Sequence, residues 1–113
     1  MAENGYFKVS RKLFNEDNQF WENGRPRTRF EAWLDLINLA RYKSEPQKVI
    51  IGNKVILCHQ GELLRSVKSL SERWIWNESA VRRFLNILIE TESIKRANEV
   101  VTTRITIVNY SKY

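Results

Sequence analysis

Two helix patterns lie next to each other between residues 66 and 91, and this pairing constrains the fold more than any other feature. The first covers residues 67–74, where apolar side chains recur at i, i+3 and i+7 after Ser66, a good N-cap. The second covers residues 78–91, after a short break that ends in another good N-cap, Asn77. Its apolar side chains are Val81, Phe84, Leu85, Leu88 and Ile89. A short helix, a tight turn and a longer amphipathic helix in this order are typical of a helix-turn-helix.

Helix and strand signals also precede this pair. Residues 28–43 predict a first core helix, because Thr28 and Glu31 fit a capping box and apolar side chains then recur at helical spacing. The side chains expected on its buried face are Phe30, Trp33, Leu34 and Ile37, widened by Leu36, Leu39 and Ala40. Residues 48–65 predict a β-hairpin with a two-residue Gly-Asn turn, followed by a further short strand.

The two ends of the chain complete the expected order of elements. Residues 94–108 predict a second β-hairpin, with its turn at residues 98–99. Residues 1–27 form an N-terminal extension, in which residues 6–9 fit a short strand and residues 11–14 fit a turn of helix. The order is therefore helix, hairpin, helix-turn-helix and hairpin.

This order predicts an α+β fold in which residues 1–113 form a single winged-helix domain. The winged helix-turn-helix carries an additional β-hairpin before the helix-turn-helix, and residues 94–108 are its C-terminal wing. A chain of 113 residues is long enough for one modest hydrophobic core. With 42% hydrophobic and 28% charged residues, the composition is typical of a globular domain rather than a disordered chain.

The charge balance favours an anionic partner, of which nucleic acid is the commonest. The formal net charge is +6. Positive charge is spread evenly over both halves of the chain, so any basic patch must be created by folding. No apolar run approaches the roughly 20 residues that a membrane span needs. Residues 1–5 lack the basic start and the apolar stretch of a signal peptide, so we expect a cytoplasmic protein without a membrane partner.

The helix at residues 78–91 presents the candidate face for double-stranded DNA. Opposite its apolar stripe, polar side chains recur at i, i+3, i+4 and i+7. Arginine pairs well with guanine and asparagine with adenine, and a recognition helix works from its N-terminal part. Basic side chains on the preceding helix and on the wing are placed to contact phosphates. The candidate DNA-binding residues are Asn77, Ser79, Arg82, Arg83 and Asn86 on this helix, Lys68 and Arg73 before it, and Lys95, Arg96 and Arg104 on the wing.

The sequence gives no support to an enzyme. Cys58 and His59 are adjacent, but they are the sole cysteine and histidine, and a structural zinc site needs four ligands. We expect Cys58 to act as a small hydrophobic residue. No Gly-rich phosphate loop and no Ser/His/Asp arrangement stands out. We therefore expect no catalytic residue, no metal and no cofactor.

Several stretches of the chain resemble one family. They are residues 30–36 (FEAWLDL), 74–77 (WIWN), 81–85 (VRRFL) and 105–113 (ITIVNYSKY), and the opening GYFKVSR at residues 5–11 fits the same pattern. Together they resemble the N-terminal winged-helix domain of phage replisome organisers and DnaD-like primosomal replication proteins. The resemblance implies a role in starting phage or plasmid DNA replication, by binding origin DNA and recruiting helicase-loading proteins. It also implies that Arg82 and Arg83 lie on the DNA-facing helix.

Two positions depart from the family pattern. The family often has glycine in the turn where this chain has Ile75. It also tends to have glutamine after the glycine that corresponds to Gly61, where this chain has Glu62. Ile75 therefore requires either a turn without positive φ or some strain. In the family a linker and a second helical domain usually follow the final NYSKY-like segment. Here the sequence ends at that segment, so it is either a fragment or a stand-alone domain.

Two alternatives to a replication protein stay open. The first is a transcriptional regulator of the same fold, because a fold does not fix a function. The second is an oligomerisation or protein-interaction module without sequence-specific DNA binding. The hairpin from Lys48 to Leu57 has apolar residues on both faces, so one face can pack on the helices while the other is left for a second copy. The family resemblance also implies self-association, and this alternative is compatible with DNA binding.

Overall fold

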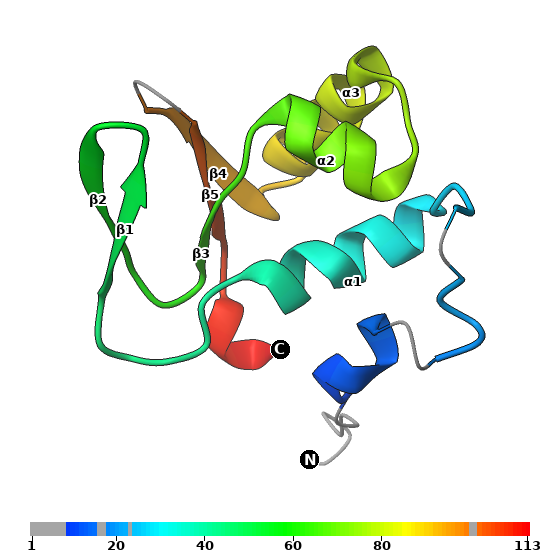
Figure 1. The fold of residues 1–113 in the computed structure, drawn as a ribbon, viewed down its shortest axis with the longest axis horizontal. Helices are drawn as coiled ribbons and strands as arrows, with labels where there is room; N and C mark the ends of the chain where they lie inside the picture. Colours follow the sequence, from blue (N-terminus) through cyan, green and yellow to red (C-terminus); the bar gives the residue numbers. More distant parts are fainter. Residues whose placement is uncertain (1–8, 16–17, 23, 100–101) are drawn as a thin grey trace.

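Three helices gather on one side of the molecule and a β-hairpin projects from the other, in a computed structural model that describes residues 9–15, 18–22, 24–99 and 102–113 (Figure 1). The helices are α1 (Arg29–Leu39), α2 (Val67–Trp74) and α3 (Glu78–Glu90). The strands are β1 (Gln47–Ile51), β2 (Lys54–Cys58), β3 (Glu62–Leu64), β4 (Ile94–Asn98) and β5 (Thr103–Ile107). Short 3-10 helices cover Arg11–Phe14, as predicted, and Tyr110–Lys112. The described residues thus form a small α+β domain with two antiparallel sheets. The strand expected at residues 6–9 lies outside them, apart from Val9.

The five strands form two separate antiparallel sheets. β1 and β2 form a two-stranded sheet, and its pairing of Ile51 with Lys54 leaves residues 52–53 as the predicted two-residue turn. The other sheet has the order β3-β5-β4. β3 therefore pairs with β5, near the end of the chain, rather than with the hairpin before it. The predicted hairpin of β4 and β5 is confirmed, although β4 continues through Asn98.

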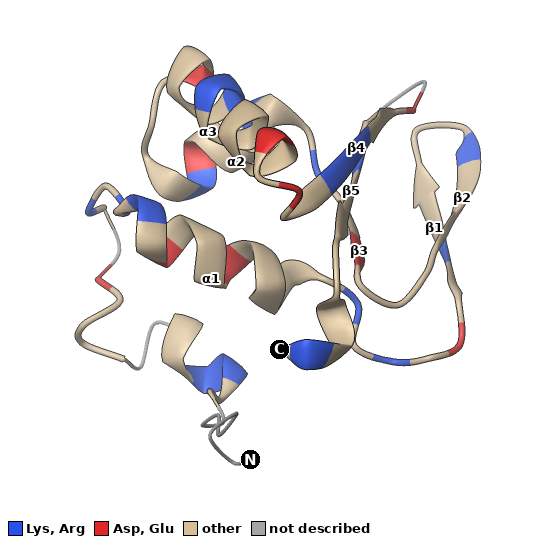
Figure 2. Ribbon diagram, turned by 180° about the vertical axis from the view of Figure 1, so that it is seen from behind, with Lys and Arg blue, Asp and Glu red and all other residues tan. Residues whose placement is uncertain are grey.

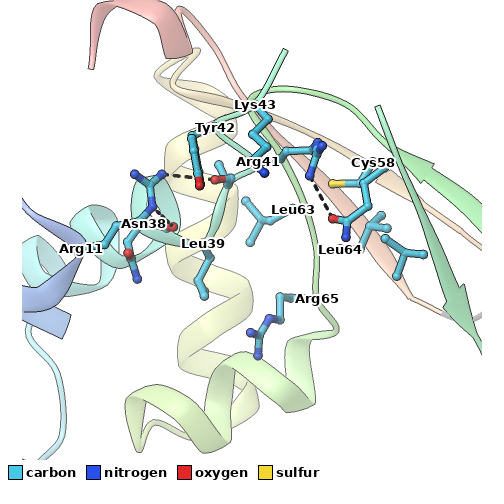
Figure 3. A pocket seen from close by; sticks show the side chains of 13 residues that line it. Arg11, Asn38, Leu39, Arg41, Tyr42, Lys43, Cys58, Leu63, Leu64 and Arg65 are labelled. Atoms are coloured by element: carbon cyan, nitrogen blue, oxygen red, sulfur yellow. Dashed lines mark hydrogen bonds between the residues drawn. The ribbon is translucent and has the colours of Figure 1, made fainter. Parts of the chain in front are cut away.

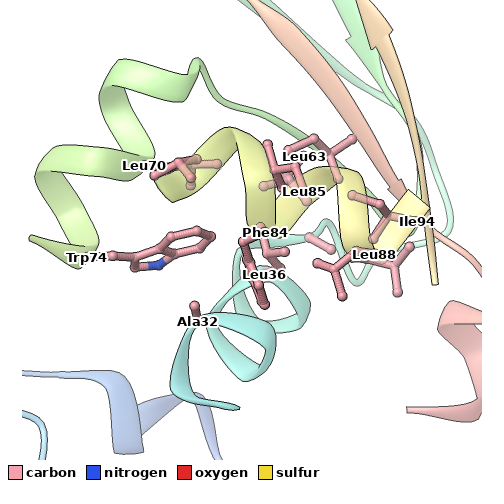
Figure 4. Close-up of a cluster of buried hydrophobic side chains, with 13 residues drawn as sticks. Ala32, Leu36, Leu63, Leu70, Trp74, Phe84, Leu85, Leu88 and Ile94 are labelled. Atoms are coloured by element: carbon pink, nitrogen blue, oxygen red, sulfur yellow. The ribbon is translucent and has the colours of Figure 1, made fainter. Parts of the chain in front are cut away.

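The hydrophobic core lies between the three helices and the inner face of the three-stranded sheet (Figure 4). Trp74 of α2 fills its centre and is fully buried. Leu36 packs there from α1, Leu85 from α3, and Ile94 and Ile105 from the sheet. Because every helix contributes to this one cluster, the outer faces of α2 and α3 are held in fixed positions.

α2 has the predicted bounds, α3 ends one residue before its predicted end, and both predicted N-caps are confirmed. The side chain of Ser66 accepts a hydrogen bond from the Ser69 amide at the start of α2, and that of Asn77 accepts one from the Ala80 amide at the start of α3. Four of the five apolar residues predicted for the buried face of α3 are buried, whereas the prediction for Ile89 is wrong because its side chain is exposed. Among the described residues, no helix combines the length and the apolar character that crossing a membrane requires.

Helix α1 differs from its prediction in length and in its buried face. The capping box of Thr28 and Glu31 is confirmed, but the helix ends at Leu39 rather than at Lys43. It ends there because the next residues join the sheet region, where the Arg41 amide donates to the carbonyl of Glu62. Phe30, expected in the core, is 68% exposed. Leu36 and Ala40 are buried as predicted, and Trp33, Ile37 and Leu39 pack half-buried against the core. Ala32 and Asp35, which were not predicted, complete the buried face.

The β1–β2 hairpin does not pack a face on the helices, which corrects the expectation for it. Figure 1 shows it standing apart from α1, α2 and α3. Ile50 is 76% exposed and Val55 is 64% exposed, and the two are direct cross-strand partners. Cys58, at the base of the hairpin, is buried as predicted. The hairpin is therefore an apolar projection attached to the body of the domain near its base.

Candidate nucleic-acid interface

The turn between α2 and α3 sets the direction of the candidate recognition helix. α2 ends at Trp74, and Ile75 takes a left-handed conformation with φ 58° and ψ 49°. The amides of Ile75 and Trp76 both donate to the carbonyl of Ser71, which closes the end of the helix. The isoleucine thus occupies a conformation that glycine adopts without cost. Asn77 then starts α3.

An aromatic cluster fixes α3 against α1 and α2. The ring centroids of Trp76 and Phe84 are 5.3 Å apart, and those of Trp74 and Phe84 are 5.9 Å apart. Both pairs have the edge-to-face geometry that aromatic rings favour. The indole N–H of Trp76 donates to the carbonyl of Arg27, 2.6 Å away, just before α1. Trp76 therefore acts as a packing residue, and its ring is not presented as a stacking platform for bases.

The outer face of α3 carries the four polar residues predicted for it. Ser79, Arg82, Arg83 and Asn86 are all exposed, and the opposite face of the helix is buried. Figure 2 shows Lys and Arg positions on the α3 ribbon and on the neighbouring β4 ribbon. A rigid helix that presents two guanidinium groups, an amide and a hydroxyl can donate and accept hydrogen bonds over about two turns.

Contacts within the protein leave most of this face available. Arg82 bonds Glu78 at 3.2 Å, but both side chains are about half exposed, so a stronger anion can replace that carboxylate. Arg83 and Asn86 make no side-chain hydrogen bond or ion pair with other described residues. The Ser79 hydroxyl donates to the side-chain oxygen of Asn77 and supports the N-cap.

Arg73 of α2 has a structural partner that the sequence did not predict. Its Nε and Nη2 atoms donate to the carboxylate of Asp35, at 2.5 and 2.8 Å. The indole of Trp74 donates to the same carboxylate at 2.8 Å. The hydrogen bonds that Arg73 donates to Asp35 raise the pKa of Arg73 above its ordinary value. This guanidinium is thus occupied inside the fold and offers little to a phosphate.

Arg104 of β5 is likewise engaged within the protein. It bonds Glu62 and Glu99, both at 2.6 Å, and the carbonyl of Leu57, also at 2.6 Å. Burial alone lowers the pKa of Arg104, but hydrogen bonds to Glu99 and Glu62 outweigh burial and leave the pKa raised. Glu62 of β3 therefore supplies a partner for a basic residue of the β4–β5 hairpin.

The remaining candidates lie on α2 and β4, the two elements that contact α3. Lys68 on α2 and Lys95 on β4 are exposed and have no ion-pair partner among the described residues. Arg96 is half-buried, and its Nε has no hydrogen-bond partner there. Part of the Arg96 guanidinium is thus buried in the protein rather than presented to a phosphate.

The acidic partners of Arg73 and Arg104 were not predicted from the sequence. Asp35 follows the buried Ala32 by three residues and precedes the buried Leu36, and it was not predicted as a buried residue. The available signal was an acidic residue within the buried stripe, since a buried carboxylate requires a nearby cation. Across the described ranges, no three His, Cys, Asp or Glu side chains are grouped to hold a metal ion. Comparisons with family models, with curated proteins and with solved structures found no match to this chain.

Proposed function

We propose that this is a winged-helix domain that binds double-stranded DNA through the outer face of α3. The observation that carries the proposal is the set of Ser79, Arg82, Arg83 and Asn86, all exposed on one face of a helix fixed by its opposite face. In this proposal α2 and α3 are the helix-turn-helix, and the hairpin of β4 and β5 is the wing.

The chemistry of the face suits base recognition flanked by phosphate contacts. Arg82 and Arg83 bond guanine bidentately, and Asn86 bonds adenine, when the helix enters the major groove. Lys68 and Lys95 lie on the two elements next to α3 and contact phosphates on either side. Arg73 and Arg104 serve instead to hold the helix pair and the wing in place, because both are engaged by carboxylates.

The resemblance of the sequence to replisome organisers and DnaD-like proteins supports initiation of phage or plasmid replication as the process. Under this proposal the domain binds origin DNA and acts with helicase-loading proteins. A transcriptional regulator is the alternative with the same contacts, since the DNA-binding face does not distinguish the two roles.

The test starts from selection of binding sequences from a pool of random duplexes. We expect one motif to be enriched, and Arg83→Ala and Asn86→Ala each to weaken binding to it by about 1–3 kcal/mol in fluorescence anisotropy. Lys54→Ala is the matched control, because Lys54 is an exposed cation at the turn of the projecting hairpin. Equal losses in Arg83→Ala and Lys54→Ala would show that α3 is not the recognition helix. A pool without enrichment would contradict sequence-specific binding.

Self-association through the hairpin is a second candidate function, favoured by its exposed cross-strand pair. Ile50 and Val55 form a continuous apolar patch on a strand pair that has a free edge. We expect sedimentation equilibrium to report an oligomer that Ile50→Lys converts to a monomer. Ile87→Lys, at an exposed isoleucine of α3, is the control that leaves the oligomer intact. A wild-type monomer at high concentration would contradict the proposal.

A further inference from the structure

A cavity of about 460 Å³ opens between the end of α1, the base of the hairpin and the start of α2 (Figure 3). Its volume falls within the range of sites that hold a small ligand or one or two side chains of a partner. It is built by different elements from the exposed face of α3, so the proposed DNA contacts do not use it.

The wall of the cavity is positively charged on several sides. Of the described residues that line it, four are cationic, namely Arg11, Arg41, Lys43 and Arg65, and none is acidic. Among the described residues, Arg41, Lys43 and Arg65 form no ion pair. A concave wall with one sign of charge attracts a ligand of the opposite sign.

Of these cations, Arg65 gives the strongest indication of an anionic ligand. It is half-buried, and its side chain donates one hydrogen bond to the Ser69 hydroxyl at 3.3 Å. A guanidinium group has five N–H donors, so most of its capacity is unused by other described residues. Burial, aided by repulsion from Arg73, lowers the pKa of Arg65, and the attraction of Asp35, whose carboxylate is bonded to Arg73, does not offset it. A carboxylate supplied by a ligand would satisfy this group.

The rest of the lining is apolar. Leu39 from α1, Val49 from β1, and Leu63 and Leu64 from β3 contribute aliphatic surface between the charged groups. Tyr42 is the aromatic residue of the lining, and its ring is covered by the Arg11 guanidinium at 4.8 Å. The cavity therefore offers aliphatic surface for an aliphatic or aromatic side chain of a ligand, beside a tyrosine ring on which Arg11 occupies one face.

We propose that this cavity is a docking site for an acidic peptide segment of a partner protein, with a bulky apolar side chain flanked by carboxylates. The apolar side chain lies on Leu39 and Leu63, and the carboxylates pair with Arg65 at one end and with Arg41 and Lys43 at the other. Double-stranded DNA fits less well, because a concavity of this size admits a single side chain but is too small for the width of a duplex. Binding here leaves the α3 face open, so a partner and DNA can be held together.

The test uses a fluorescein-labelled pool of hexapeptides with Leu, Phe or Trp at the two central positions and Asp or Glu at the four outer positions. We expect saturable binding by fluorescence anisotropy. A pool with Gly and Ser at the centre, and one with Lys and Arg at the outer positions, should each bind at least about tenfold more weakly. Arg65→Gln should weaken the acidic pool about tenfold, because it removes a partly buried charge-assisted hydrogen bond.

Arg29→Gln is the matched control, since Arg29 is an exposed cation of α1 outside the cavity. Lys43→Glu is a second variant at an exposed position, where loss of folding is not expected, and it should weaken binding about fivefold. Equal weakening by Arg29→Gln and Arg65→Gln would overturn the proposal, because binding would then follow net charge alone. Equal affinity for the Gly/Ser pool would overturn it too. So would displacement of the acidic pool by a duplex of about 20 base pairs that itself binds Arg65→Gln more weakly than wild type.

Discussion

The carboxylate of Asp35 and the guanidinium of Arg73 face each other across the contact between α1 and α2, joined by hydrogen bonds of 2.5 and 2.8 Å. Asp35 is fully buried, whereas the side chain of Arg73 keeps 29% of its surface exposed. The same carboxylate also accepts from the indole of Trp74 at the centre of the core. One acidic side chain of α1 therefore sets the position of the helix that precedes the candidate recognition helix.

We expect Asp35→Ala to destabilise the domain by about 3–5 kcal/mol. The substitution leaves both the Arg73 guanidinium and the Trp74 indole without their buried acceptor, and an uncompensated buried charge is costly. Urea unfolding followed by tryptophan fluorescence measures the change. Glu78→Ala is the control, because it breaks the exposed pair with Arg82 and should cost less than about 1 kcal/mol. Similar losses in both variants would contradict the role given to Asp35.

The sequence predicts local features of this fold well and long-range pairings poorly. The caps at Ser66 and Asn77 and the Gly-Asn turn depend on neighbouring residues, so their patterns are visible in the sequence. The pairing of Arg73 with Asp35 joins residues far apart in the chain, and no local pattern predicts it.

The polar residues on the outer face of α3 could be located from helical spacing alone. Which cations are engaged within the protein could not, because Arg104 reaches Glu62 only after β3 pairs with β5. The exposure of Phe30 has a related cause. Small and paired residues, Ala32 and Asp35, are fully buried in the face of α1 that meets the core, and Phe30 at the start of the helix is left in solvent.

Replacement of Ile75 by glycine should stabilise the domain by about 0.5–1 kcal/mol. A β-branched residue with φ 58° pays a steric cost of roughly 1–2 kcal/mol, which glycine avoids, although glycine gains entropy in the unfolded chain. Ile75→Asn should give a similar gain, since asparagine tolerates this conformation. Thermal unfolding provides the measurement. Ile75→Val retains the branched side chain and is expected to give no gain; stabilisation by Val alone would point to packing instead of backbone strain.

The Glu31 carboxylate should make the stability of the domain depend on acid pH. The hydrogen bond from Arg25 is the main cause that lowers the pKa of Glu31 from 4.5 to about 2. A carboxylate with a lowered pKa contributes stability above its unfolded pKa and loses that contribution as pH falls through the folded pKa. Wild type should therefore exceed Glu31→Gln by about 1–2 kcal/mol at pH 7, a figure reduced for solvent screening of a partly exposed pair, and by almost nothing at pH 2.

Urea titrations of both proteins between pH 2 and pH 7 test this dependence, with the loss falling between about pH 5 and pH 2. Glutamine still accepts from the Thr28 amide, so the capping box is kept and the comparison isolates the charge. Arg25→Gln added to Glu31→Gln should cause little further change, because the pair is already broken. A difference between wild type and Glu31→Gln that stays constant with pH would contradict the assignment.

Gly61→Ala should destabilise the domain by more than Gly24→Ala does. Both glycines have positive φ, 82° and 81°, so alanine is strained at each. At Gly61 a Cβ would lie 2.9 Å from the Cβ of Tyr110, whereas at Gly24 it meets nothing within 4 Å. The strain alone costs about 1 kcal/mol, and the clash should add about 1–3 kcal/mol. Equal melting temperatures for the two variants would show that the Tyr110 segment moves away freely.

The pairing of β3 with β5 also has a consequence for the order of folding. α2, α3 and β4 lie between these strands in sequence, so the ladder from Leu63 to Ile105 closes a long loop that contains the helix pair. Closing such a loop lowers the entropy of the chain before the contacts of the ladder can stabilise the closed state. We therefore expect the helix pair to be largely formed in the folding transition state, and the β3–β5 ladder to close last. The face of α3 would then be assembled early, by contacts close in sequence, and locked only when the two ends of the loop meet.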